Sequence, residues 1–336
     1  MNAIIRRITR GDWTGLRERG IDRRTARFAT RSGEGAATGT PVHRPFTTID
    51  DPPLALARPE PQTVPFVFNS PHSGSHYPPD LLAASDLPLH RLRATEDVAV
   101  DRLFADVVAL GAPLLAARFP RAWLDVNREP YELDPKLVRE RLPGHANTRS
   151  LRVAGGLGTV PRLICEGVSI YRDRPSLDDV LWRIERVYRP YHDMLRGLLT
   201  QTVMRFGHAV LIDCHSMPSA ATKPEGPRPD IILGDRFGTS CHEGLTHTLA
   251  QAFERRGYHV VRNRPYAGGF ITEHYGKPFQ SLHAIQIEIN RALYMDERTL
   301  RLRDGFDALA QDLTSVMAEI MGQPVPERGA APLAAE

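Results

Sequence analysis

The sequence predicts an α/β fold, in which helices cover both faces of a mixed central sheet. Short apolar runs typical of buried strands alternate along the chain with segments of helical periodicity. Several of these apolar runs end in polar residues capable of catalysis, as strands do at the functional edge of an α/β sheet. The 336 residues, with 41% apolar and 25% charged side chains, have the composition of a globular protein.

The first half of the expected domain contains three strands and a helix. Val64–Asn69 is a buried strand that runs directly into a polar segment. A helix is expected over Glu96–Gly111, because apolar residues recur there at helical spacing and the terminal glycine is a stop signal. Two short strands and one long loop follow, at Leu114–Ala117, Ala122–Val126 and Pro143–Pro161.

The second half is expected to begin with a long helix over Ser176–Phe206. Ser176 and Asp179 form a start signal, Gly207 forms a stop signal, and Pro190 should kink or split the helix. The remaining strands are predicted at His208–Asp213, Asp230–Leu233, Tyr258–Val261 and Ala284–Ile289, and the remaining helices at Cys241–Arg256 and Arg298–Met321.

Residues 1–60 differ in composition from the rest of the chain. They are rich in arginine, then in Gly, Ala and Thr, and finally in proline. We expect a poorly ordered extension or a start codon placed too early. An arginine-rich transit peptide, weakened by its acidic residues, and a basic partner-binding arm are the alternatives. The folded domain is then expected over residues 61–322, followed by a C-terminal tail over residues 323–336.

Composition argues against several classes of function. The formal net charge of +3 is small, so nucleic-acid binding is not implied. No apolar run approaches the roughly 18 residues that a membrane helix needs. Cys165, Cys214 and Cys241 are widely spaced and contain no CxxC pair, which favours a reducing compartment and a cytoplasmic location. Any metal must therefore be held by histidines and carboxylates.

Three apolar runs end in residues that can bind a metal or transfer protons, namely His72, His215 and Glu288. A histidine at a strand end is often only structural, but a glutamate inside an Ile-rich strand needs a partner because its burial is costly. Two imidazoles and one carboxylate suit a single divalent metal, Zn²⁺ above all, with one position left open for water. The third ligand is expected to be Glu96 or Asp97, and we favour Asp97.

Arginines near the predicted strand at 122–126 provide groups for an anionic substrate. Arg128 can bind a carboxylate with two parallel hydrogen bonds, and Arg121 can stabilise an oxyanion. The alternative is that both form surface salt bridges. Asp213 precedes His215 by two positions and can orient its imidazole.

An ordered set of short motifs occurs between about Val64 and Met321. The motifs are Ser70–Gly74, Phe119–Arg128, Gly156–Thr159, Ile170–Tyr171, Asp213–Pro218, Gly268–Phe270, Tyr275–Pro278 and Gln286–Met295. Taken together, they resemble the N-formylglutamate amidohydrolase family. That family is distantly similar to zinc carboxypeptidases and aspartoacylases, so the resemblance implies a phosphorylase/hydrolase-like α/β fold.

The resemblance also implies an activity and a metal site. The expected reaction is metal-dependent hydrolysis of N-formyl-L-glutamate to L-glutamate and formate, as in histidine degradation. His72 and His215 match the metal histidines, and Glu288 matches the general base. The distant relatives take two ligands from a His-x-x-Glu motif, whereas the corresponding position here is Ser75.

Roles in substrate binding follow in the same way. Asn127 and Arg128 match a pair that holds a substrate carboxylate, and Arg121 matches an arginine that polarises the carbonyl. A substrate with two carboxylates should need a second cation. Arg291 is one candidate, and the others lie in the 145–162 loop at Arg149, Arg152 and Arg162.

Other functions remain open at this stage. The same chemistry could act on a different N-acyl amino acid or a small peptide, and the fold could belong to a binding protein without catalysis. The expected partner is a small N-acyl amino acid rather than a nucleic acid or a membrane. The oligomeric state cannot be inferred from the sequence.

Overall fold

The computed structural model describes residues 46, 52–165, 167–221 and 228–322. Most of the expected N-terminal extension and all of the expected C-terminal tail lie outside these residues. One part of the predicted extension is described, because Leu54–Ala57 form strand β1. The boundary predicted at residue 60 is therefore corrected to a position before residue 54. None of the described helices is both long enough and apolar enough to span a bilayer.

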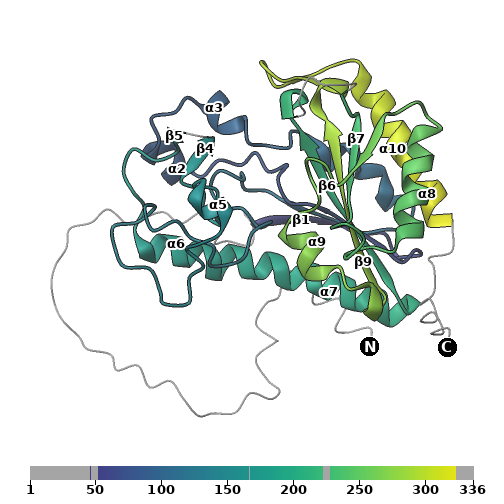
Figure 1. Ribbon diagram of the computed structural model, residues 1–336, viewed down its shortest axis with the longest axis horizontal. Coiled ribbons are helices and arrows are strands. Elements are labelled where there is room, and N and C mark those ends of the chain that lie inside the picture. Colours follow the sequence, from purple (N-terminus) through teal and green to yellow (C-terminus); the bar gives the residue numbers. More distant parts are fainter. Residues whose placement is uncertain (1–45, 47–51, 166, 222–227, 323–336) are drawn as a thin grey trace, which may run out of the picture. The chain divides into compact units, whose positions relative to one another are not determined.

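A seven-stranded mixed sheet forms the centre of the fold, as predicted (Figure 1). Its other strands are β2 (Phe66–Ser70), β3 (Leu114–Ala117), β6 (Ala209–Met217), β7 (Ile231–Gly234), β8 (Val260–Arg262) and β9 (Leu282–Asn290). The strand order is β1-β3-β2-β6-β9-β7-β8. Strands β3, β2, β6 and β9 run parallel, whereas β1 pairs antiparallel with β3 and β7 with β9.

Helices cover both faces of this sheet (Figure 1). On one face lie α7 (Arg189–Phe206) and α9 (Phe270–Tyr275), and on the other lie α4 (Val100–Leu103), α8 (Glu243–Glu254) and α10 (Gly305–Gly322). The main apolar core lies under the second set, where fully buried strand residues such as Ile212 and Ile287 belong to one cluster with Leu249 and Leu313. Burial of these side chains is the main stabilising contribution to the domain.

Short elements gather in Figure 1 on the side of the sheet away from α8 and α10. They are α2 (Pro79–Ala84), α3 (Leu89–Arg93), α5 (Leu151–Ala154), β4 (Leu163–Cys165) and β5 (Val168–Ser169). The other short elements are η2 (Ala105–Val108), η4 (Ser219–Ala221), η5 (Pro278–Gln280), η6 (Arg291–Leu293), β10 (Met295–Asp296) and β11 (Arg301–Leu302).

The long helix predicted over 176–206 is divided, as the proline suggested. Helix α6 (Leu177–Arg183) passes into a π-helical segment, η3 (Ile184–Tyr188), and α7 then begins with Pro190 in its first turn. Pro190 has no N–H to donate to the preceding turn, and the wider π-helical turn directly before it accommodates its ring. The predicted signals at both ends are confirmed, since Ser176 accepts a hydrogen bond from the Asp179 amide and Gly207 has a φ of 80°.

Four predicted elements differ from the structure. Ala122–Val126 is not a strand, because the amide of Trp123 bonds to Pro120 in a turn and that of Asp125 bonds to the distant carbonyl of Thr159. The helix predicted over 96–111 is reduced to the short α4 and η2. The final helix begins at Gly305 rather than Arg298, and α5 lies within the loop predicted over 143–161.

Gly74 allows the chain after β2 to pass close to another backbone segment. A Cβ atom at this position would overlap with the carbonyl oxygen of Phe119 and with the backbone of Arg118. We expect Gly74→Ala to lower the free energy of unfolding by about 1–3 kcal/mol, because the backbones must move apart. Gly144→Ala is the matched control, since its Cβ would meet no atom within 4 Å. Equal denaturation midpoints for the two variants would contradict this view of the loop.

Candidate active site

The topology brings the three predicted strand-end residues together at one edge of the sheet. His72 lies two residues beyond the end of β2, and His215 lies near the carboxyl end of β6. Glu288 lies on the neighbouring strand β9, directly opposite His215 in the parallel register. The carboxyl ends of parallel strands share one edge, which is where α/β proteins place their sites.

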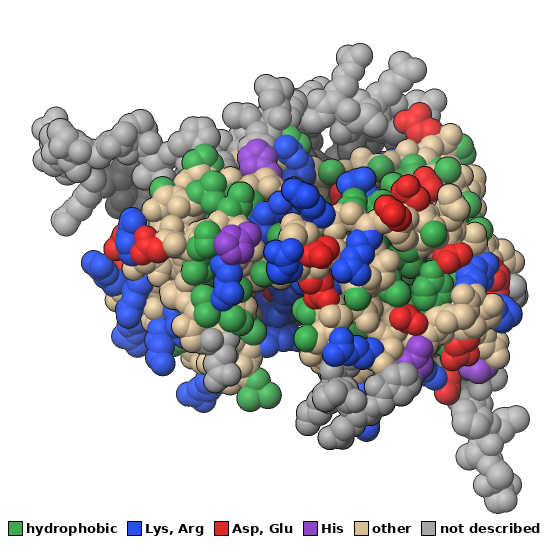
Figure 2. Space-filling model, turned by 90° about the horizontal axis from the view of Figure 1, so that it is seen from above, with side chains coloured by type: hydrophobic (Ala, Val, Ile, Leu, Met, Phe, Trp, Pro, Cys, Tyr) green, Lys and Arg blue, Asp and Glu red, His purple; other side chains and the backbone are tan. Residues whose placement is uncertain are grey.

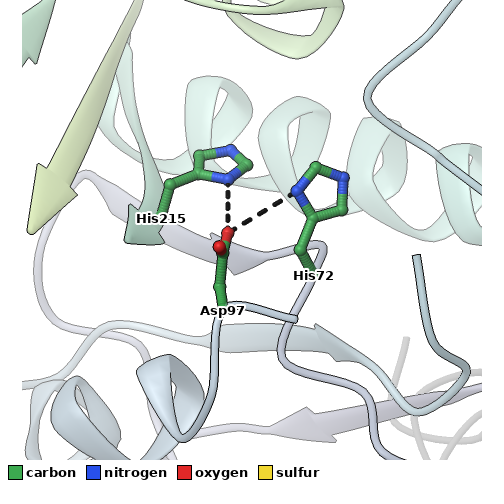
Figure 3. Close-up of side chains that lie close together, drawn as sticks. All are labelled: His72, Asp97 and His215. Atoms are coloured by element: carbon green, nitrogen blue, oxygen red, sulfur yellow. Dashed lines mark hydrogen bonds and ion pairs between the residues drawn. The ribbon is translucent and has the colours of Figure 1, made fainter. Parts of the chain in front are cut away.

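His72, Asp97 and His215 form a buried group at this edge (Figure 3). The Oδ2 atom of Asp97 lies 2.9 Å from Nδ1 of His215 and 3.6 Å from Nδ1 of His72. One ligand atom from each residue lies within 4.8 Å of the other two. The Nδ1 atom of His72 is buried and has no hydrogen-bond partner among the described residues, as a nitrogen awaiting a cation would be. The group can therefore hold a metal ion.

A second carboxylate lies behind each imidazole. Nε2 of His72 lies 2.8 Å from Oδ1 of Asp125, and Nε2 of His215 lies 3.0 Å from Oδ2 of Asp213. Such carboxylates fix the tautomer so that the opposite nitrogen is free to bind a metal. The contact of Asp213 confirms the sequence-based expectation. The partnership of Asp125 was missed, although its place in the Asp-Val-Asn-Arg segment had marked a polar cluster.

The structure separates the two candidate carboxylates. Glu96 accepts three hydrogen bonds from Arg93, at 3.1 to 3.2 Å, and lies outside the His72–Asp97–His215 group. Asp97 faces both imidazoles with one oxygen and receives Arg291 Nη2 on the other at 3.0 Å. The geometry therefore agrees with the preference for Asp97.

Asp97 and His215 each lie beside groups of the opposite charge, which shift their pKa values. Burial alone would raise the pKa of Asp97, but its hydrogen bond with His215 and the nearby His72 and Arg291 hold that pKa well below its ordinary value. Burial would lower the pKa of His215, yet Asp213 and Asp97 hold it well above its ordinary value. This edge of the sheet thus favours a positive charge between the carboxylates.

Glu288 is only 7% exposed, and its pKa is shifted in the opposite direction to that of Asp97. Burial raises its pKa to about 7, against the opposing effect of His215. Its Oε1 atom accepts a hydrogen bond of 2.7 Å from the side-chain amide of Gln286. A carboxyl group with this pKa can both accept and release a proton near neutral pH.

A cavity of about 560 Å³ opens beside the group and is lined by Asp97, His215 and Glu288 among others. Its cations are four arginines, Arg91, Arg121, Arg128 and Arg291. The face shown in Figure 2 carries a hollow near its middle, with Lys and Arg side chains around it. A pocket with this excess of guanidinium groups suits an anionic ligand.

Arg121 and Arg128 both approach Asp125, although the expected strand between them is absent. Nε of Arg121 lies 2.9 Å from Oδ2 of Asp125, and Nη2 of Arg128 lies 3.5 Å from the same oxygen. Arg128 also donates to the carbonyl oxygens of Leu157 and Asn127. These contacts fix both guanidinium groups at the cavity while leaving the terminal nitrogens of Arg121 without a partner among the described residues.

The side chain of Asn127 is held by hydrogen bonds within the protein. Its side-chain oxygen accepts the Ile271 amide at 2.8 Å, and its side-chain nitrogen lies 3.5 Å from Asp213 Oδ2 and 3.2 Å from His215 Nε2. It does not line the cavity. These contacts place Asn127 behind His215, and its predicted contact with a substrate carboxylate stays a prediction.

Arg291, the predicted second cation for substrate, is also held by contacts within the protein. Its guanidinium donates to Asp97, to the Ser216 hydroxyl at 3.1 Å and to the Ala94 carbonyl at 3.2 Å. It therefore fixes the carboxylate of Asp97 and also lies at the cavity wall, and its contact with a substrate stays a prediction. The loop arginines do not replace it, because Arg149, Arg152 and Arg162 are not among the residues that line the cavity.

The carboxylate of Asp213 provides a test of how the imidazoles are held. Asp213→Asn would replace the acceptor of the His215 Nε2–H with an uncharged amide. We expect metal affinity to fall by about 10- to 100-fold, because such outer partners orient the ligand and raise its basicity. Competition with a chromogenic chelator measures this change. Unchanged affinity would show that Asp213 does not support the ligand.

The fold and this group of side chains define an α/β protein with a buried His-Asp-His group that can hold a metal ion beside a glutamate. Residues 64–295 match the model of the N-formylglutamate amidohydrolase family, and the chain belongs to that family.

Two curated relatives are N-formylglutamate deformylases. The protein from Pseudomonas aeruginosa is 31% identical over 239 residues, covering 70% of this chain and 84% of the relative. The protein from Pseudomonas putida is 30% identical over 240 residues, covering 70% and 83%.

Solved structures agree with this placement. The N-formylglutamate amidohydrolase from Ralstonia eutropha JMP134 has a TM-score of 0.76 and 36% identity, covering 80% of this chain and 98% of that one. A protein from Agrobacterium tumefaciens, at 19% identity and a TM-score of 0.57, shares the fold.

Proposed function

We propose that this chain is a zinc-dependent enzyme that hydrolyses N-formyl-L-glutamate to L-glutamate and formate. The observation that carries this proposal is the position of Glu288 in the same cavity as two members of the His72–Asp97–His215 group. The choice of substrate is supported by the Pseudomonas relatives, because both are described as N-formylglutamate deformylases.

The donor set fits zinc better than a hard cation. Two imidazole nitrogens and one carboxylate oxygen are the ligands of many catalytic zinc sites, which leave one position open. Nδ1 of His72, Nδ1 of His215 and Oδ2 of Asp97 would hold the ion. When bound, zinc polarises a carbonyl and lowers the pKa of a water molecule towards ~7.

Glu288 is the proposed proton carrier. Its carboxylate takes a proton from the attacking water and later delivers it to the nitrogen of the departing amino acid. The water oxygen forms a bond to the formyl carbon, and the C–N bond then breaks. Gln286 holds Oε1 of Glu288, which leaves Oε2 to exchange the proton.

The cavity arginines provide the remaining roles. Arg121 turns only its Nε towards Asp125, so its terminal nitrogens are available to the oxyanion that develops on the formyl oxygen. Arg128 is proposed to bind the α-carboxylate, with its orientation fixed by Leu157 and Asp125.

A formate-release screen over N-formyl amino acids tests the proposal. We expect N-formyl-L-glutamate to be the preferred substrate, and we expect a chelator to abolish turnover until zinc is restored. Another N-acyl amino acid or a small peptide as the preferred substrate would change the specificity but keep the chemistry. No release from any of these compounds, or full activity in the chelator, would contradict the proposal.

A cytoplasmic role in histidine degradation is part of the same proposal. The described cysteines support the location alone, since Cys165, Cys214 and Cys241 form no disulfide with one another. Proteins of reducing compartments keep such thiols free.

A further inference from the structure

Arg91 differs from the other arginines that line the cavity. Arg121 and Arg128 are bound to Asp125, and Arg291 is bound to Asp97. The guanidinium of Arg91 has no hydrogen bond or ion pair within the described part of the chain, and its side chain is exposed at the cavity. It is thus the cavity cation whose charge is not already compensated by a carboxylate.

The helix that carries Arg91 is attached to the metal-binding group. Helix α3 ends at Arg93, and the carbonyl oxygen of the next residue, Ala94, accepts a hydrogen bond from Arg291. Arg291 in turn donates to Asp97. The buried side chain of Leu92 fixes the other side of α3 in the protein interior. Arg91 is therefore held at a defined place at the cavity, although its own side chain is free to reach towards a ligand.

The charge balance of the cavity indicates which ligand this is. Four arginines face three carboxylates, Asp97, Asp125 and Glu288. A bound divalent cation would add two further positive charges. A ligand with two carboxylates compensates this excess better than a ligand with one, because unpaired charges of one sign in a confined cavity repel each other.

We propose that Arg91 binds the side-chain carboxylate of the substrate and so determines the preference for acidic N-formyl amino acids. This inference rests on the proposed function. With Arg128 assigned to the α-carboxylate and Arg121 to the formyl oxygen, Arg91 is the remaining cation with unused donors. Arg91 is thus a specificity-determining residue at the cavity and takes no part in bond breaking.

Two substrates of the same shape separate charge recognition from other effects. N-formyl-L-glutamine replaces the side-chain carboxylate by an uncharged amide. In the wild type we expect kcat/KM to be higher for N-formyl-L-glutamate. In Arg91→Gln we expect the ratio of the two kcat/KM values to fall by about tenfold, mainly through a higher KM for the acidic substrate. Arg91→Lys should restore part of the preference, because a lysine keeps the charge but not the planar fork.

Arg186→Gln is the matched control, because Arg186 is an exposed helical arginine that does not line the cavity. This variant should keep the wild-type ratio. An unchanged ratio in Arg91→Gln, or an equal loss of kcat/KM for both substrates, would overturn the role of Arg91 alone. A wild type that releases formate from neither compound would instead overturn the proposed function, and the role of Arg91 with it.

Discussion

Replacing Glu288 with glutamine is expected to lower the rate of formate release by about 10²–10⁴-fold while leaving the metal in place. Glutamine has nearly the same shape but cannot accept a proton from water. The ligand atoms belong to His72, Asp97 and His215, so the metal content should not change. Steady-state kinetics and elemental analysis of the purified variant measure the two quantities.

The exposed carboxylate of Glu243 provides the control for this substitution. Its side chain is 83% exposed, so Glu243→Gln should keep full activity. Retained turnover in Glu288→Gln would rule out Glu288 as the general base. Loss of metal from that variant would show instead that Glu288 is a ligand.

A second large effect is expected from Asp97→Asn compared with Glu96→Gln. The first variant replaces the carboxylate that faces both imidazoles, while the second changes a neighbour that is paired with Arg93. We expect Asp97→Asn to weaken metal binding by more than the ~100-fold typical of outer partners and to lose turnover accordingly. Glu96→Gln should retain the metal. Metal titration of both variants after chelation and dialysis gives the comparison.

Two outcomes for Asp97→Asn and Glu96→Gln would contradict the assignment of Asp97 as the ligand. If Glu96→Gln lost the metal and Asp97→Asn kept it, the ligand set drawn in Figure 3 would be wrong. Equal loss in both variants, accompanied by a lower denaturation midpoint, would point to disruption of the segment after α3 rather than to a missing ligand.

The position of the site could be predicted because it depends on topology. His72, His215 and Glu288 follow or end apolar runs, and parallel neighbours must bring such residues to one edge. From the sequence, the third ligand could only be narrowed to Glu96 or Asp97. The choice depends on the turn before α4, where Ala99 has a φ of 57° and no sequence signal fixes the direction of each side chain.

The partners of the long polar side chains could not be predicted. Asn127 and Arg291 lie beside the site as expected, but their hydrogen bonds go to the protein, because Ile271 and Ala94 come from distant parts of the chain. Nothing in the sequence indicated that Arg91 lines the cavity, since a single arginine on a short helix resembles any surface residue. The apolar run at 122–126 suggested a strand, but its residues are buried in turns rather than in a ladder.

The most direct test is anomalous X-ray scattering from crystals of the zinc-loaded protein, recorded on both sides of the zinc absorption edge. We expect one peak per chain, within coordination distance of His72 Nδ1, His215 Nδ1 and Asp97 Oδ2, with Glu288 beside it. A zinc-loaded crystal with no peak among these three atoms, or with its peak at another group of residues, would contradict it.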